Sequence, residues 1–161
     1  MGRYYDTSTG RNGKFMFAVQ NSDDPEYMGM GEDPTYIHYY ASDQDKDKIT
    51  KRLDEQYDIL GIDKKNRLYD MPRKDDGSDD FEAYDKWEEK YLHDKVWKYV
   101  KHSEQSDEDK KKITWSSNKG SEYVGIEIES GRCLALARIR LAIKILSDIN
   151  DEGYCSLDAE L

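Results

Sequence analysis

The sequence has few of the residues that disulfide frameworks, metal sites and membrane spans require. It contains two cysteines and three histidines among 161 residues. We interpret Cys133 and Cys155 as small buried residues of an intracellular protein, with a redox pair as the alternative. No apolar run is long enough to cross a bilayer, and no hydrophobic leader precedes Phe15. We therefore expect neither membrane insertion nor secretion.

The chain also lacks an excess of positive charge. It carries 25 basic and 35 acidic residues, so its formal net charge is -10. Such a surface repels nucleic-acid phosphates and anionic membranes. The clusters of lysine and arginine are flanked by acids, which favours solvated helix faces over a nucleic-acid site. The charge fits a protein partner with a basic surface better than it fits a nucleic acid.

Motifs for catalysis and cofactor binding are missing as well. The sequence has no nucleophile elbow, no phosphate-binding loop, no dinucleotide fingerprint and no zinc-ligand spacing. The alternating acids Asp43, Asp45 and Asp47 start like a calcium loop, but Lys48 stands where that loop needs glycine. We predict no cofactor and no metal site. The sequence alone leaves open whether the protein is an enzyme.

The most informative stretch that is present is Gly131–Leu161. Its first part is rich in helix formers and aliphatic residues that form two neighbouring stripes at helical spacing, which predicts a helix over 132–149 packed on several neighbours. Gly153 can end this helix in a left-handed conformation. The residues from Tyr154 onward alternate, with Tyr154 and Ser156 on the face opposite Cys155 and Leu157, which predicts a half-buried strand.

The remaining pattern predicts a single α+β domain over 1–161, in which a small, mainly antiparallel sheet is covered by about three helices. The predicted helices are 43–60, 79–101 and 132–149, and the predicted strands are 14–20, 35–40, 123–129 and 154–161. Ser42 and Asp45 form a capping box, Glu82 completes a second one on Asp79, and Gly61 ends the first helix. We expect 14–20 to be the second arm of an N-terminal hairpin and to lie mid-sheet. Acidic loops are expected near 21–34, 62–78 and 103–121. A competing interpretation runs one helix from Ser121 to Ile149.

Two functions are compatible with these residues. The leading hypothesis is a non-catalytic, acidic protein-interaction module, because tyrosine and tryptophan are favoured at interfaces. The alternative is a small ligand-binding or nucleotide-binding protein, or a hydrolase, with a polar pocket at the ends of the N-terminal strands. The residues expected to contact a partner are Tyr27, Met28, Met30, Trp87 and Trp97. The pocket would use Arg3, Tyr5, Gln20 and Ser22 for binding, and Asp23, Asp24 and His38 for catalysis.

Three segments carry a family resemblance: the start at Gly2-Arg3-Tyr4-Tyr5, the stretch from Gly13 to Asp24, and Gly153-Tyr154-Cys155 near the end. Together they resemble short uncharacterised proteins of large DNA viruses and environmental viral sequence. The resemblance covers mainly the two ends of the chain and brings no catalytic residues. It implies a viral accessory or host-modulating protein that acts inside an infected cell.

Overall fold

The long helix α6 (Arg132–Glu152) leads directly into the strand β8 (Tyr154–Glu160), as the sequence predicts. Gly153 separates them with a φ of 84°, a left-handed value that glycine adopts without strain. The computed structural model describes residues 3–7, 18–19, 24–33, 38–110, 113–114 and 122–160. Within these residues, α6 and β8 are the elements around which the others pack.

The main sheet has five strands in the order β2-β1-β8-β4-β3, and every pair in it is antiparallel. Its strands other than β8 are β1 (Arg3–Thr7), β2 (Ala18–Val19), β3 (Gly31–Asp33) and β4 (His38–Ser42). The N-terminal strand β1 pairs with the C-terminal strand β8, so the two ends of the described chain lie in one sheet. The predicted second hairpin arm appears as β2, which lies at an edge of the sheet rather than in its middle. The other residues of 14–20, and residues 35–37 of the predicted strand 35–40, lie outside the described residues.

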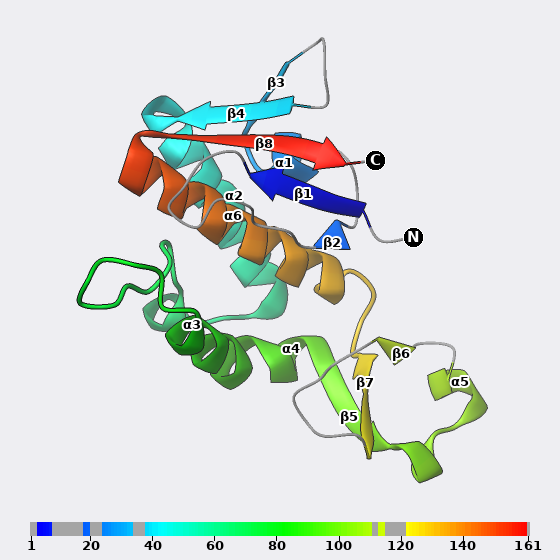
Figure 1. The fold of residues 1–161 in the computed structure, drawn as a ribbon. Coiled ribbons are helices and arrows are strands. Elements are labelled where there is room, and N and C mark those ends of the chain that lie inside the picture. Colours follow the sequence, from blue (N-terminus) through cyan, green and yellow to red (C-terminus); the bar gives the residue numbers. More distant parts are fainter. Residues whose placement is uncertain are drawn as a thin grey trace.

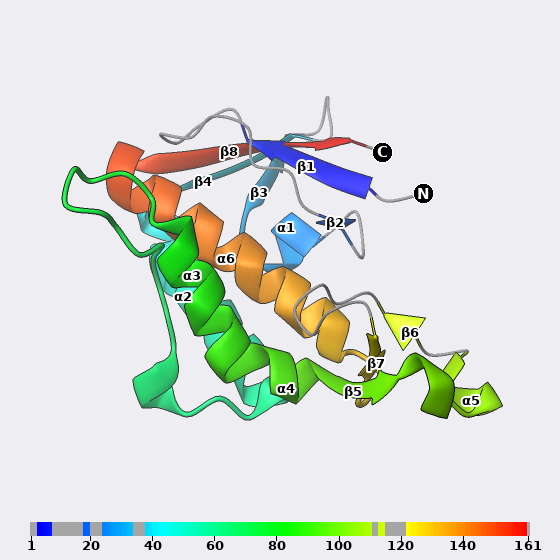
Figure 2. The same cartoon turned by 60° about the horizontal axis from the view of Figure 1, so that its bottom comes forward.

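Helices cover one face of this sheet. Figure 2 shows the sheet close to edge-on, with α6 and α2 (Lys46–Leu60) on the same side of it. Tyr39, Ala41, Cys155 and Leu157 are buried on that side. No described helix covers the opposite face. The sheet is therefore half-buried, which explains the alternation seen in the last residues of the sequence.

The start and end of α2 agree with the prediction. A 3₁₀ turn at Asp43–Asp45 precedes the helix, and the Ser42 backbone N–H donates a hydrogen bond of 2.9 Å to the Asp45 carboxylate. Gly61 ends the helix with a φ of 72°. α2 packs along α6 (Figure 1), so their apolar stripes face each other and form the centre of the core.

The predicted helix 79–101 is shorter than expected. Asp80, and not the predicted Asp79, caps α3 (Phe81–Glu88) by accepting a hydrogen bond of 3.0 Å from the Ala83 N–H. The helix continues as a π-helical turn, Glu89–His93, and ends with α4 (Asp94–Val96). The following residues form the strand β5 (Trp97–Lys101). The prediction of a helix over these residues was wrong. Aromatic and β-branched side chains such as Trp97, Tyr99 and Val100 are also favoured in strands when a partner strand is available.

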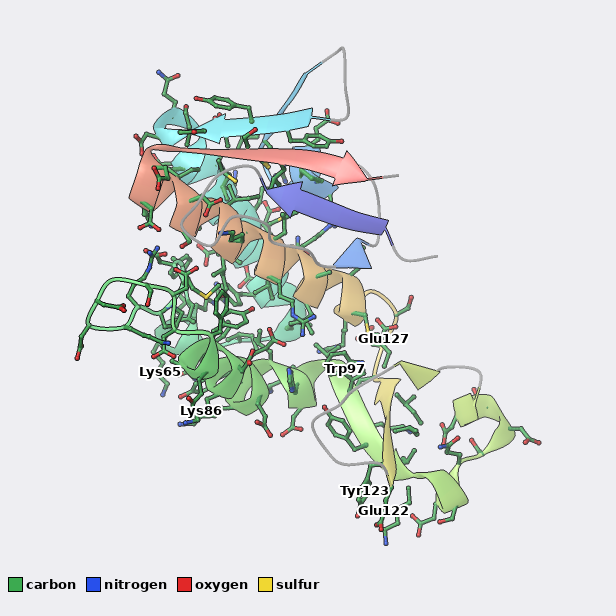
Figure 3. The ribbon with its side chains drawn as sticks, viewed as in Figure 1. Lys65, Lys86, Trp97, Glu122, Tyr123 and Glu127 are labelled. Atoms are coloured by element: carbon green, nitrogen blue, oxygen red, sulfur yellow. The ribbon has the colours of Figure 1, made fainter. Side chains whose placement is uncertain are left out.

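That partner is β7 (Tyr123–Glu127), which confirms the strand predicted at 123–129 and excludes a helix running through Gly131. However, β7 belongs to a separate three-stranded sheet of order β5-β7-β6, with β6 at Ile113–Thr114, and not to the main sheet. Figure 1 shows this second sheet beside the N-terminal end of α6. Figure 3 shows Trp97 and Glu127, which are cross-strand neighbours, close to that helix end. The Glu127 carboxylate accepts a 2.8 Å bond from the Cys133 N–H, which stabilises the first turn of α6.

The acidic segments contain more structure than predicted. Segment 21–34 contains α1 (Asp24–Tyr27) and β3, and segment 103–121 contains α5 (Asp107–Lys110) and β6. Segment 62–78 is a connector with one 3₁₀ turn, Lys64–Asn66. The overall class agrees with the prediction: a single compact α+β domain with small antiparallel sheets.

Candidate functional site

The π-helical turn brings together a buried ionic cluster. Glu88 ends α3, and its carboxylate accepts hydrogen bonds from His93 Nε2 at 2.9 Å and from Arg140 Nε at 3.0 Å. A second Arg140 nitrogen, Nη2, also contacts this carboxylate, so the α6 guanidinium binds it through two atoms. Burial would raise the pKa of Glu88, but the bonds from His93 and Arg140 outweigh it and lower the pKa from 4.5 to about 2.

A histidine oriented by a carboxylate is an arrangement found in catalytic dyads. Here both side chains are inaccessible, because 7% of the His93 side chain and 5% of the Glu88 side chain are exposed. The Trp97 ring also packs edge-on against the His93 ring, with centroids 5.4 Å apart. A substrate cannot reach the imidazole, so the cluster joins α3 to α6 and stabilises the π-helical turn.

A second buried group lies further along α6, one to two turns beyond Arg140. Lys144 Nζ donates to Asp148 at 2.8 Å, and both side chains are almost completely buried. The Cys155 thiol of β8 lies 3.6 Å from the other oxygen of the Asp148 carboxylate. This group connects the helix to the strand that follows it. The burial of Cys155 agrees with the sequence interpretation, whereas Cys133 is only partly buried.

The segment around α1 is part of the core, which corrects the expectation that it meets a partner. Asp24 is buried and pairs with Arg138 at 2.9 Å, and the same guanidinium lies 3.9 Å from the centre of the Tyr27 ring. Met28 and Met30 are buried in the hydrophobic core. The buried charge of Asp24 is thus neutralised by a cation of α6.

The other residues expected to contact a partner are also largely engaged. Tyr27 is 39% exposed, but it also has the Arg52 guanidinium 5.2 Å from its ring centre. Trp97 is buried, and Trp87 is partly buried and donates its indole N–H to the Asn66 carbonyl at 2.7 Å. Met28, Met30 and Trp97 are therefore not available to a partner, because each fills space inside the fold.

The backbone pairing bears on the N-terminal pocket that the sequence predicts. Tyr5 pairs with Ala159, whereas His38 pairs with Asp158, the residue before it on β8. Successive residues of a strand belong to opposite faces of the sheet, so Arg3 and Tyr5 share one face and His38 belongs to the other. The remaining members Gln20, Ser22 and Asp23 lie outside the described residues.

The face of the main sheet opposite the described helices presents a pair of tyrosines. Tyr40 of β4 is 50% exposed and Tyr154 of β8 is 40% exposed. Their rings are stacked, with centroids 6.0 Å apart and planes inclined by 24°. The sequence alternation assigned Tyr154 to this outward face. Tyr40 was missed because the run of tyrosines before Ala41 does not show which one points away from the core.

Two exposed carboxylates lie near the end of β8 that carries Tyr154. Tyr154 pairs with Ser42, and the next residue along the chain is the exposed Asp43. The Asp43 carboxylate lies 3.7 Å from the position that a Cβ on Gly153 would occupy, directly before Tyr154. Glu152, at the end of α6, is also exposed. We call the stacked pair Tyr40 and Tyr154, together with the exposed Asp43 and Glu152 at the same end of β4 and β8, the tyrosine–carboxylate patch.

A comparison with protein-family models, with curated proteins and with solved structures finds no match to this chain. Among the described residues, no group of three or more His, Cys, Asp or Glu side chains is arranged to hold a metal ion. No helix in the described part of the chain is both long and apolar enough to span a bilayer. The chemistry available at the tyrosine–carboxylate patch is therefore the main guide to function.

Proposed function

We propose that this protein is a non-catalytic interaction module that binds a protein partner through the tyrosine–carboxylate patch. The observation that carries the proposal is the exposed, stacked pair Tyr40 and Tyr154 on the face of the sheet opposite the described helices. Stacked rings are already ordered, so they lose little conformational freedom when a partner covers them. Tyrosine also combines a large apolar surface with a polar hydroxyl group, so it can face water in the free protein and be buried when a partner binds.

The buried position of His93 beside Glu88 supports a non-catalytic role for that cluster. The alternative of a small ligand-binding protein or hydrolase is less favoured, because the backbone register puts Tyr5 and His38 at positions of opposite faces. The resemblance to viral proteins suggests a partner inside an infected cell, as part of the same proposal.

The test compares partners captured by three immobilised forms of the full chain. These are the wild type, the double variant Tyr40→Ser/Tyr154→Ser, and the control Ile59→Ser. Ile59 is an apolar side chain of α2 that is 51% exposed, so its replacement changes surface apolarity away from the patch. Circular dichroism would establish that all three forms are folded.

We expect at least one protein to bind the wild type and Ile59→Ser equally and to be lost from the double variant, as quantified by mass spectrometry. The proposal is wrong if every captured protein binds the double variant as well as it binds the wild type. It is also wrong if Ile59→Ser removes the same partners, because binding would then follow general surface apolarity.

A further inference from the structure

We propose that the tyrosine–carboxylate patch recognises arginine side chains of a basic segment in its partner. This inference rests on the proposed function and names the chemistry of the partner at the same patch. Each arginine would lie over a tyrosine ring and donate hydrogen bonds to a neighbouring carboxylate.

The chain already binds its own Arg138 in this way. The guanidinium donates to the Asp24 carboxylate at 2.9 Å, and its carbon lies 3.9 Å from the centre of the Tyr27 ring. A planar cation can satisfy both contacts at once, because its N–H groups point outward in the plane while its face stacks on the ring.

Arg67 repeats the arrangement in another part of the fold. It donates to Asp54 at 3.0 Å and to Asp58 at 2.7 Å, and it lies 5.4 Å from the centre of the Tyr57 ring. Two independent sites thus combine tyrosine, carboxylate and arginine. In both, the arginine comes from another part of the same chain.

The tyrosine–carboxylate patch offers two exposed tyrosine rings with exposed carboxylates at the same strand ends, and, within the described residues, no arginine or lysine lies over either ring. Asp43 and Glu152 supply exposed carboxylates on the two connections that lead into the paired ends of β4 and β8. A cation from another molecule would complete the arrangement that Arg138 and Arg67 complete internally.

The overall charge favours the same class of partner. A net charge of -10 attracts basic segments over several ångströms and repels phosphate groups. Arginine is favoured over lysine, because an ammonium group is more strongly hydrated and has no flat face to stack on a ring. The occupant is therefore a protein segment rich in arginine, rather than a nucleic acid or a lipid surface.

The experiment measures fluorescence anisotropy of short labelled peptides mixed with the full chain at low salt. One peptide alternates arginine with glycine, the second replaces every arginine by lysine, and the third replaces every arginine by citrulline. Citrulline keeps the shape of arginine but is neutral, so the third peptide controls for contacts that do not need charge.

We expect the arginine peptide to bind several-fold more tightly than the lysine peptide, and the citrulline peptide to show no binding. Tyr40→Leu/Tyr154→Leu should weaken binding of the arginine peptide by about fivefold to tenfold, because two exposed cation–π contacts are lost. Tyr40→Phe/Tyr154→Phe keeps both rings and should bind like the wild type. Asp43→Asn should weaken binding and reduce its dependence on salt.

Equal affinity for the arginine and citrulline peptides would overturn the inference, as would unchanged binding by the double leucine variant. If the arginine peptide does not bind but Tyr40 and Tyr154 are still required for partner capture, the proposed function survives and the arginine chemistry is wrong. If partner capture is also independent of the tyrosines, both proposals fail.

Discussion

Replacing Glu88 with glutamine should destabilise the fold by removing one buried charge without changing the shape of the side chain. The pKa of Glu88 is lowered from 4.5 to about 2, so the folded protein favours its charged form. At about 1.4 kcal/mol for each pH unit, this lowering corresponds to about 3 kcal/mol of stability. The variant also leaves the cation of Arg140 without its carboxylate.

The sign of the pH dependence follows from the direction of this shift. Because the pKa of Glu88 is lower in the folded protein, the carboxylate adds its full stability above about pH 4.5. That stability is lost as the pH falls through about 2. The difference in unfolding free energy between wild type and Glu88→Gln should therefore be about 3 kcal/mol at neutral pH and about half of that near pH 3.

The assay is urea denaturation followed by tryptophan fluorescence at both pH values. Glu82→Gln is the matched control on the same helix, since its pair with Lys86 is exposed to solvent and should leave stability unchanged. The reasoning is refuted if Glu88→Gln is as stable as the wild type at neutral pH. It is equally refuted if the difference does not shrink in acid.

Three substitutions and one labelling experiment test the packing of the fold. Gln56 is buried and, among the described residues, its amide has no hydrogen-bond partner, so Gln56→Met should stabilise the fold by ~1 kcal/mol in urea denaturation. Gly61→Ala should lower the free energy of unfolding by ~1 kcal/mol, because alanine is strained in the left-handed backbone conformation of this residue. Gly29→Ala should lower it further, because the new Cβ would also lie 3.1 Å from an α2 side chain. A maleimide reagent should modify Cys133 in the folded protein and Cys155 only in denaturant; early labelling of Cys155 would contradict its burial.

Local patterns predicted the elements whose stability depends on their own sequence. The stripe Ile49, Leu53, Tyr57 and Leu60 is buried as expected, and Gly61 takes the left-handed conformation that ends the helix. Such signals act within one or two turns of the chain, so they can be recognised without knowing the fold.

The errors involve contacts between residues far apart in the sequence. Asp24 looked like part of a solvated loop because its partner Arg138 lies 114 positions away. Trp97 continued a helical stripe, and only its pairing with Glu127 decides for a strand. Helix and strand patterns coincide over such short aromatic runs, and the sequence does not show which distant segment will pair.

The contacts between distant segments predict which elements should be most resistant to local unfolding. α6 is buried along most of its length, and β8 is hydrogen-bonded on both sides, to β1 and β4. Opening either element would therefore separate the main sheet from the helices, which amounts to unfolding the domain. Hydrogen exchange followed by NMR should find the slowest amides in residues 132–149 and 154–157, and faster exchange in the edge strand β5. If amides of α6 exchanged as fast as those of β5, the terminal helix and strand could not be the elements that hold the core together, and the sheet that carries Tyr40 and Tyr154 would lack its rigid support.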